Sequence, residues 1–245
     1  MELIHELLGY KNIKIIQNPE MFCFSLDSIL LANFVSISSK TNRIIDLGCG
    51  NAPIPLFLTL KTKAFITGVE IQKEVADMAT RSVELNNLQN QIEIINDDLK
   101  GIYKRNFANI FDIVTTNPPY FKYNPEGNIN KNEYLTIARH EVKVTLADIV
   151  DEAKKLLIDG GALYMVHRAE RLTDIIMEMQ TNNFAIKRIQ FVYPKTNSKE
   201  ALLVLIEARK NRQPGIKVIE PLYVYKDNGE YTEIIKKIFN FQKID

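Results

Sequence analysis

From residue 42 onward, short apolar runs alternate with longer amphipathic stretches, and this alternation constrains the fold more than any other feature of the sequence. Apolar runs typical of buried strands lie at residues 43–47, 64–69, 92–95, 111–116 and 162–166. Apolar residues recur at helical spacing in residues 73–88 and 146–158, and another helix ends near Gln180. Strands that alternate with helices predict a parallel sheet with helices on both faces.

The pattern changes at both ends of this region. Two β-rich runs, residues 186–193 and 201–208, are joined by a polar loop and predict an antiparallel hairpin at one end of the sheet. Before residue 42 there is room only for a small strand-and-helix appendage, with a helix at about 27–37. We therefore expect an α/β fold with a seven-stranded, mostly parallel sheet. Residues 1–41 would form the appendage, 42–210 the main domain, and 211–245 an extension packed on the same domain.

Composition limits the kinds of partner. Lys and Arg number 31 against 30 Asp and Glu, so a nucleic-acid partner would need a local basic patch. Two cysteines, Cys23 and Cys49, predict neither a disulfide framework nor a metal cluster, and the three histidines lack metal-ligand spacing. The sequence shows no signal peptide and no apolar run long enough for a membrane span. We expect a cytoplasmic protein without a metal, a membrane or an obligate protein partner.

The first turn of the sheet contains Gly48 and Gly50, directly after Asp46 and Leu47. Ligands of open α/β sheets bind outside the carboxyl ends of the strands, and glycines let the backbone approach them closely. An ordinary strand-to-helix turn would show the same two glycines. A nicotinamide-dinucleotide site would need a third glycine where this chain has Pro53. Because the acid at Asp46 would also repel a pyrophosphate, the turn favours a cationic ligand.

Acidic residues follow the next two strands. Glu70 lies about twenty residues after the glycines, where a carboxylate can accept from ribose hydroxyls, although a solvated acid would fit the same place. Asp98 could accept from an adenine amino group, and Asp97 is its close competitor. Together, these strand ends predict a nucleoside pocket without phosphates.

The most specific motif is Asn117-Pro118-Pro119-Tyr120, immediately after the fourth strand. The prolines stiffen the backbone and fix two acceptors, the Asn117 side chain and the Pro118 carbonyl, which can bind a planar amino group. Tyr120 offers an aromatic face for a base. A turn with a buried tyrosine would show the same residues, but its combination with the acidic strand ends favours a binding site.

These residues together resemble the class I S-adenosylmethionine-dependent methyltransferases that modify planar amino groups. More specifically, the chain resembles the bacterial tRNA1(Val) adenine-37 N6-methyltransferase family over nearly its whole length. Further matching stretches lie at residues 24–31, 138–141, 166–171, 194–195, 214–215 and 221–225. The resemblance implies a Rossmann-like class I methyltransferase fold for residues 42–210. It also implies an enzyme that methylates N6 of an adenine in tRNA, with A37 of a valine tRNA as the expected target.

The resemblance also implies roles for individual residues. The methyl donor would be bound by Ser25, Asp27, Asp46, Gly48, Gly50, Glu70 and Asp98. Asn117 and the Pro118 carbonyl would accept from the target amine and stabilise its developing positive charge, without a strong general base. Tyr120, with Phe121, would stack on the base. Residues 187–217 hold eight Lys and Arg against two Glu. This basic segment would grip tRNA phosphates, with Lys195 and Arg212 as the expected contacts, although a merely solvated surface would carry the same charges if they do not share one face.

Two points qualify this assignment. Relatives usually carry a third glycine where this chain has Ala52, and an alanine fits there if its φ is negative. The Asn-Pro-Pro-Tyr motif is also shared by enzymes that methylate rRNA bases, DNA adenines and release-factor glutamines. Release-factor enzymes carry an N-terminal helical domain and DNA enzymes a target-recognition domain, and this chain has no room for either. A non-catalytic RNA-binding module would have little reason to combine these residues, and would not bind the methyl donor.

Overall fold

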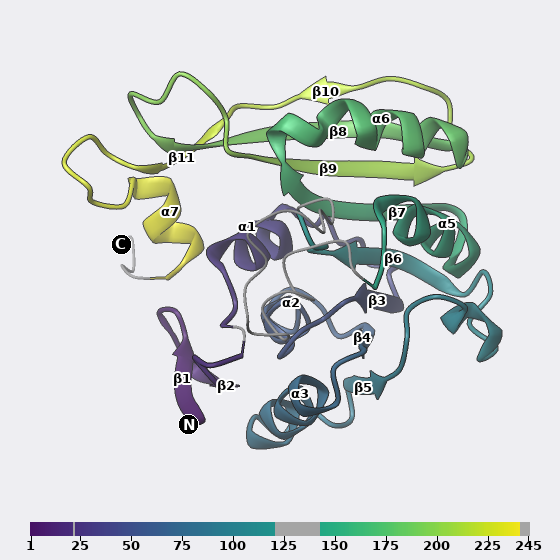
Figure 1. Cartoon of the computed structure of the whole chain (residues 1–245), viewed down its shortest axis with the longest axis horizontal. Coiled ribbons are helices and arrows are strands. Elements are labelled where there is room, and N and C mark those ends of the chain that lie inside the picture. The colour runs from purple at the N-terminus through teal and green to yellow at the C-terminus, as the bar shows by residue number, and fades with distance from the viewer. Residues whose placement is uncertain (22, 121–142, 241–245) are drawn as a thin grey trace, which may run out of the picture.

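The computed structural model describes residues 1–21, 23–120 and 143–240 of the chain. Its centre is a nine-stranded sheet with the order β10-β8-β9-β7-β6-β3-β4-β5, in which β11 also pairs with β8 (Figure 1). The strands are β3 (Arg43–Leu47), β4 (Phe65–Glu70), β5 (Ile92–Asn96), β6 (Phe111–Thr116), β7 (Leu157–Arg168), β8 (Phe184–Lys195), β9 (Leu203–Lys210), β10 (Lys217–Val218) and β11 (Leu222–Tyr225).

The pairing of these strands confirms the predicted mixed sheet. Strands β3 to β7 pair in parallel, whereas β9 runs antiparallel to both β7 and β8. The prediction of seven strands left out β10 and β11, which pair in parallel with β8. They contain two and four residues, too few for an apolar periodicity to be visible in the sequence.

Strand β7 begins earlier than the sequence indicated. It starts at Leu157, directly after α5 (Leu146–Leu156), so Gly160 and Gly161 lie inside the strand and do not close the helix. A Cβ at Gly161 would lie 3.0 Å from the carbonyl oxygen of Ile158 and 3.2 Å from that of Asp112. The pairing of β6 with β7 changes register beside these glycines, and the backbones approach closely there. This close approach explains why both positions are glycine, and the end of a helix does not.

The helices cover both faces of the sheet. The remaining helices are α1 (Leu26–Phe34), α2 (Pro53–Leu58), α3 (Lys73–Leu85), α6 (Leu172–Thr181) and α7 (Glu233–Ile238). Alternate strand residues point to opposite faces, so Ile44 packs with α1 and α2, whereas Ile45 packs with α5 and α6. Within the described residues, no helix has both the length and the apolar character that crossing a membrane requires.

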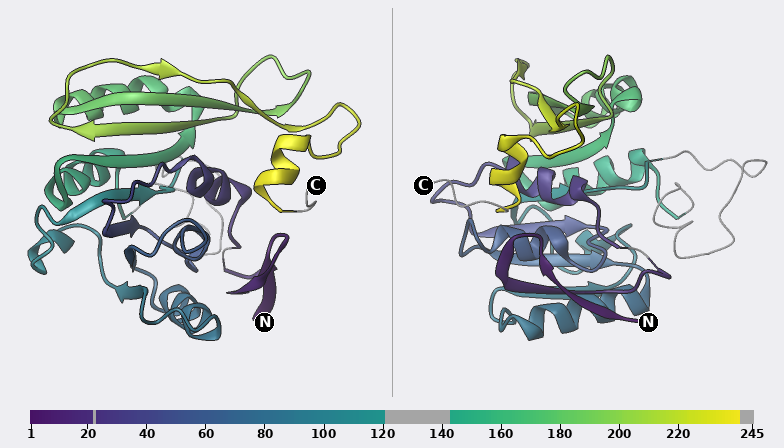
Figure 2. Two further views of the ribbon diagram at one scale, coloured as in Figure 1. Left: turned by 180° about the vertical axis from the view of Figure 1, so that it is seen from behind. Right: turned by 90° about the vertical axis from the view of Figure 1, so that its left-hand side faces the viewer.

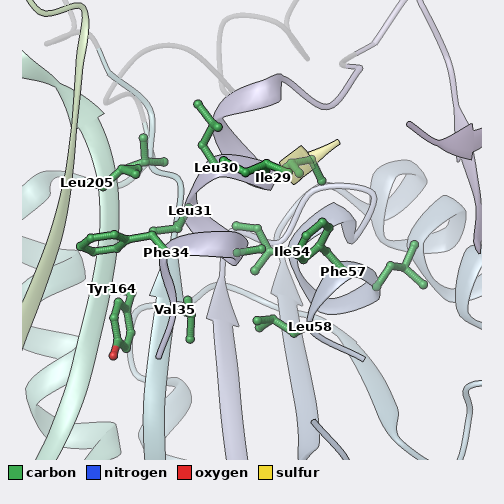
Figure 3. Packing of buried hydrophobic residues seen from close by; sticks show 14 of the residues in the cluster. Ile29, Leu30, Leu31, Phe34, Val35, Ile54, Phe57, Leu58, Tyr164 and Leu205 are labelled. Atoms are coloured by element: carbon green, nitrogen blue, oxygen red, sulfur yellow. The ribbon is translucent and has the colours of Figure 1, made fainter. Parts of the chain in front are cut away.

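Helix α1 is built into the largest buried apolar cluster of the described residues. Its Phe34 ring lies edge-on to Tyr164 of β7 at a centroid distance of 6.0 Å, and Leu31 is fully buried nearby (Figure 3). Ile54 and Phe57 of α2 belong to the same cluster. This packing holds the first turn of α1 in a fixed position relative to the sheet.

An N-terminal hairpin, β1 (Leu3–Leu7) with β2 (Tyr10–Gln17), forms a separate sheet. The hydroxyl of Ser82 in α3 accepts from the Ile16 amide at 2.9 Å, and Asn51 donates to the Ile16 carbonyl at 2.9 Å. The Gly9 amide donates to the Phe239 carbonyl at 2.9 Å, so the hairpin also contacts the end of α7 (Figure 2). The hairpin is therefore tied to both the glycine turn and the C-terminal helix.

The domain boundaries at 41 and 210 stay a prediction.

Candidate active site

A cavity of about 370 Å³ lies at the carboxyl ends of β3, β4, β5 and β6. This is the edge of the sheet at which the sequence predicted a ligand. Nine of the predicted site residues line it: Ser25, Asp27, Gly48, Gly50, Glu70, Asp98, Asn117, Pro118 and Tyr120. Ser28, Asn51 and Lys143 also line the cavity and were not predicted.

The glycine turn forms one wall of the cavity. Gly48 and Gly50 have φ angles of 70° and 55°. Apart from their chain neighbours, no heavy atom of the described residues lies within 4 Å of the place where either Cβ would be. Open space over both residues leaves room for a ligand against the backbone.

Ala52 does not meet the condition under which an alanine fits this position without strain. Its φ is +69° and not negative, and the residue is fully buried. It has this conformation because its amide donates to the Cys49 carbonyl in a tight turn that leads directly into α2. A left-handed conformation costs an L-residue about 1–2 kcal/mol, which explains why a glycine is usual at this position.

Glu70 connects the second strand to the glycine turn. Its Oε2 accepts from the Gly50 amide at 3.0 Å, and its Oε1 accepts from the Gln72 amide at 2.9 Å. Burial raises the pKa of this carboxyl above its ordinary value, while the backbone hydrogen bonds oppose the rise. Because each carboxylate oxygen can accept more than one hydrogen bond, both oxygens can still accept from a ligand.

Asp46 lies deeper than the other acids and is only 1% exposed. Its Oδ1 accepts from the Thr115 hydroxyl at 2.6 Å, whereas its Oδ2 is buried without a hydrogen-bond partner among the described residues. Burial raises the pKa of Asp46 to about 7, and the nearby charge of Glu70 adds to this rise. An unpaired carboxylate oxygen in such a place favours a cationic ligand.

The structure distinguishes the two aspartates after β5. The Oδ2 of Asp97 forms an ion pair with Arg105 at 2.7 Å, and its Oδ1 accepts from the Asp98 amide at 2.8 Å. Asp98 uses its Oδ1 to accept from the Lys100 amide at 2.9 Å. Because the arginine already engages Asp97, the arrangement favours Asp98 as the residue that contacts a ligand.

The Asn-Pro-Pro-Tyr loop is held against the first turn of α1. The Asn117 amide donates to the Ser28 hydroxyl at 3.0 Å. The Tyr120 hydroxyl lies 2.7 Å from Asn117 Oδ1 and 2.8 Å from Asp27 Oδ2, and its ring lies 5.3 Å from that of His167. Sequence reasoning did not identify Ser28, although it stands beside Asp27 in the matching stretch 24–31.

The remaining predicted contacts lie elsewhere. Phe121 falls outside the described residues. Lys195 is exposed at the carboxyl end of β8, on the same edge of the sheet as the cavity, but it does not line the cavity. Arg212 lies against Gly160 near the start of β7, at the opposite edge. The structure therefore does not bring Arg212 together with the site.

Several side chains of the predicted basic segment are engaged within the protein. Arg188 and Arg209 each form an ion pair with Glu207, both at 2.9 Å. Lys210 is buried and donates to the Leu157 carbonyl at 2.7 Å. These cations stabilise the β7–β9–β8 part of the sheet, and the segment does not present them together as one free basic face.

Comparisons with known proteins find related sequences over most of the chain. The methyltransferase small domain family matches residues 12–191. A tRNA1(Val) (adenine(37)-N6)-methyltransferase of Haemophilus influenzae strain PittEE is 26% identical over 226 residues, which cover 91% of this chain and 92% of the relative. The protein of the same name from Flavobacterium psychrophilum is 24% identical over 238 residues, with coverage of 95% and 99%.

Solved structures share the fold. A predicted O-methyltransferase from Agrobacterium tumefaciens has a TM-score of 0.69 at 22% identity, covering 87% of this chain and 95% of its own. TYW2 of M. jannaschii, solved in complex with AdoMet, has a TM-score of 0.57 at 14% identity, with 85% coverage of both chains. The Rossmann-like class I methyltransferase fold expected from the sequence is confirmed.

Proposed function

Because the chain belongs to the methyltransferase small domain family, we propose that it methylates N6 of an adenine in tRNA, with A37 of a valine tRNA as the target. The relatives that support this target carry it in their names and match the chain over more than nine-tenths of its length. The observation that carries the proposal is the position of Asn117 and Pro118. They line the same cavity as the Gly48–Gly50 turn and Glu70.

The cavity residues fit S-adenosylmethionine as the cofactor. When bound, this molecule supplies an electrophilic methyl group on a sulfonium. Its amino-acid portion carries an ammonium. Asp46 does not itself line the cavity, but it lies two residues before Gly48 and its unpaired Oδ2 favours a positive charge nearby. Glu70 retains acceptor capacity for ribose hydroxyls, and Asp98 for an adenine amino group. The open space over Gly48 and Gly50 lets the turn backbone lie against the ligand.

The residues of the Asn-Pro-Pro-Tyr loop would act on the target amine. An exocyclic amine is a weak nucleophile because its lone pair is delocalised into the ring. Hydrogen bonds from the amine to Asn117 Oδ1 and the Pro118 carbonyl would localise that lone pair and stabilise the positive charge that develops on nitrogen. The base must leave its stack to reach these acceptors, and Tyr120 would hold the ring. The methylated amine then loses its proton to water.

The partner and location follow from the same proposal. A tRNA would bind across the edge of the sheet that holds the cavity, where Lys195 is exposed. A cytoplasmic location agrees with the presence of tRNA there, and with Cys23 and Cys49 as free thiols.

The test is methyl transfer from labelled S-adenosylmethionine to unmodified bulk tRNA, followed by mass spectrometry of the nucleosides. We expect N6-methyladenosine, whose position can then be mapped by digestion, and no product with Asn117→Ala protein. Another methylated nucleoside would overturn the target. Intact cofactor binding without transfer to tRNA would overturn tRNA as the substrate and direct the search to rRNA, DNA adenine or a release-factor glutamine.

A further inference from the structure

Four side chains join helix α1 to the Asn-Pro-Pro-Tyr loop in a continuous chain of hydrogen bonds. Asp27 Oδ2 lies 2.8 Å from the Tyr120 hydroxyl, which lies 2.7 Å from Asn117 Oδ1, and Asn117 Nδ2 donates to the Ser28 hydroxyl at 3.0 Å. Both ends of this chain belong to the first turn of α1. The carboxamide that faces the target amine is therefore oriented from the N-terminal helix.

The Tyr120 hydroxyl links Asp27 to Asn117. Its single hydrogen lies within reach of two acceptors, Asp27 Oδ2 and Asn117 Oδ1. The Asn117 amide group donates to Ser28, which holds the carboxamide with its oxygen toward Tyr120. Asn117 Oδ1 has a second lone pair, which is left for the target amine.

The surroundings of the pair agree with this bonding. Burial is the largest influence on Asp27 and raises the pKa of its carboxyl, while hydrogen bonds from Tyr120 and Ser25 and the positive charge of Arg168 in β7 oppose this rise. Burial also raises the pKa of the Tyr120 phenol, so the phenol keeps its hydrogen. The ring of His167, also in β7, packs against Tyr120.

We propose that Asp27 is a positioning residue for methyl transfer, which acts through the Tyr120 hydroxyl to fix the orientation of the Asn117 carboxamide. The proposal rests on the function proposed above. It gives Asp27 a role other than the methyl-donor contact that the family resemblance implied, because the oxygen at 2.8 Å from Tyr120 is directed to the catalytic loop. The two roles predict different kinetic effects.

The test compares Asp27→Ala, Asp27→Asn and Tyr120→Phe, singly and combined, by kcat for tRNA and by calorimetric Kd for S-adenosylmethionine. We expect Asp27→Ala to lower kcat on the order of 10- to 100-fold with Kd changed less than about twofold, because the loss is one of orientation. Asp27→Asn, whose side-chain oxygen can still accept from Tyr120, should recover most of this rate. In the Tyr120→Phe background, Asp27→Ala should have no further effect on kcat.

Asn33→Ala is the matched control, because Asn33 has an exposed side chain at the other end of α1. The proposal is wrong if Asp27→Ala lowers kcat equally in the parent protein and in the Tyr120→Phe variant. It is also wrong if the Asp27→Asn variant is as slow as Asp27→Ala. A rise in Kd for S-adenosylmethionine that matches the fall in kcat would overturn it too.

The same Asp27/Tyr120 double-mutant cycle can be measured in the free energy of unfolding, which needs no tRNA. A coupling free energy between the two substitutions supports the Asp27–Tyr120 hydrogen bond even if tRNA is the wrong substrate. The absence of coupling refutes this hydrogen bond.

Discussion

At the scale of single residues, substitutions of Asn117 and Glu70 should affect different quantities. Asn117 should determine turnover, and Glu70 the affinity for the cofactor. Asn117→Ala removes an acceptor for the target amine, so we expect turnover to be abolished while S-adenosylmethionine binds nearly as before. Glu70→Ala removes a carboxylate from the wall of the cavity, so cofactor affinity should fall. Calorimetry and single-turnover rates measure the two effects. Normal turnover in the first variant, or unchanged affinity in the second, would remove that residue from its role.

Asp46 should make stability depend on pH. Its folded pKa of about 7 lies above the unfolded value near 3.9, so the folded state holds the extra proton between these values. Stability therefore falls as pH rises from about 4 to 7, by at most about 1.4 kcal/mol per pH unit. Asp46→Asn should lack this loss. Urea unfolding of both proteins at pH 5 and pH 7 measures it, and a stability difference that stays constant would contradict the shifted pKa.

Ala52 should tolerate only small replacements. Ala52→Gly relieves the strain of a positive φ but loses a buried methyl group, so we expect a change within about 1 kcal/mol. Ala52→Val places a branched side chain in the same conformation and in a filled space, and should destabilise by about 2 kcal/mol or more. The midpoints of urea unfolding compare the two variants. A valine variant as stable as the parent would show that the turn is not strained.

Residues predicted from chemistry and strand position together line the cavity. Gly48 and Asn117 follow strands of a parallel sheet and Glu70 ends one, and the carboxyl ends of such strands meet at one edge. The φ of Ala52 could not be predicted, because it depends on the geometry of the turn that closes on the Cys49 carbonyl. The Ser28 bond to Asn117 could not be predicted either, because it joins segments far apart in the sequence.

At the scale of elements, α1 contacts the Asn-Pro-Pro-Tyr loop with its first turn and is held at its other end by a lysine. Lys61, which follows α2, donates from its Nζ to the carbonyls of Ala32, Asn33 and Val35 at the C-terminal end of α1. Lys61 is exposed as a residue, but its Nζ lies at a helix C-terminus, where the helix dipole favours positive charge.

Lys61→Ala should therefore destabilise the protein by about 1 kcal/mol, a figure kept small because water can replace part of the interaction. Lys63→Ala, two residues on and exposed, is the control. Chemical unfolding gives both values. Equal stability of the two variants would show that Lys61 does not anchor α1.

Elements were predictable where a strand or helix was long enough to show its own periodicity. The apolar run of β6 and the amphipathic spacing of α3 and α5 identified them directly. The β1–β2 hairpin carries a weak pattern, because most of β1 is exposed and the hairpin packs on α3 along one side. Its position could come only from tertiary contacts.

At the scale of the whole molecule, Lys195 and Arg212 lie at opposite edges of the sheet. If tRNA covers the edge with the cavity, Lys195→Ala should weaken RNA binding and reduce the salt slope of log K by about 1. Arg212→Ala should leave both unchanged. Fluorescence anisotropy titrations at several salt concentrations measure the slopes. Equal effects from the two variants would mean that the RNA does not approach from the cavity edge.

The contact between the N-terminal hairpin and α7 has a consequence for synthesis on the ribosome. The Tyr10 hydroxyl donates to the carbonyl of Ile238, 228 positions later in the chain. At translation rates of about 5–20 residues per second, roughly 10–45 seconds separate the appearance of the two partners. The hairpin therefore makes this contact only after α7 has been synthesised. A nascent chain can form the cavity first and join the hairpin to α7 only after α7 has left the exit tunnel.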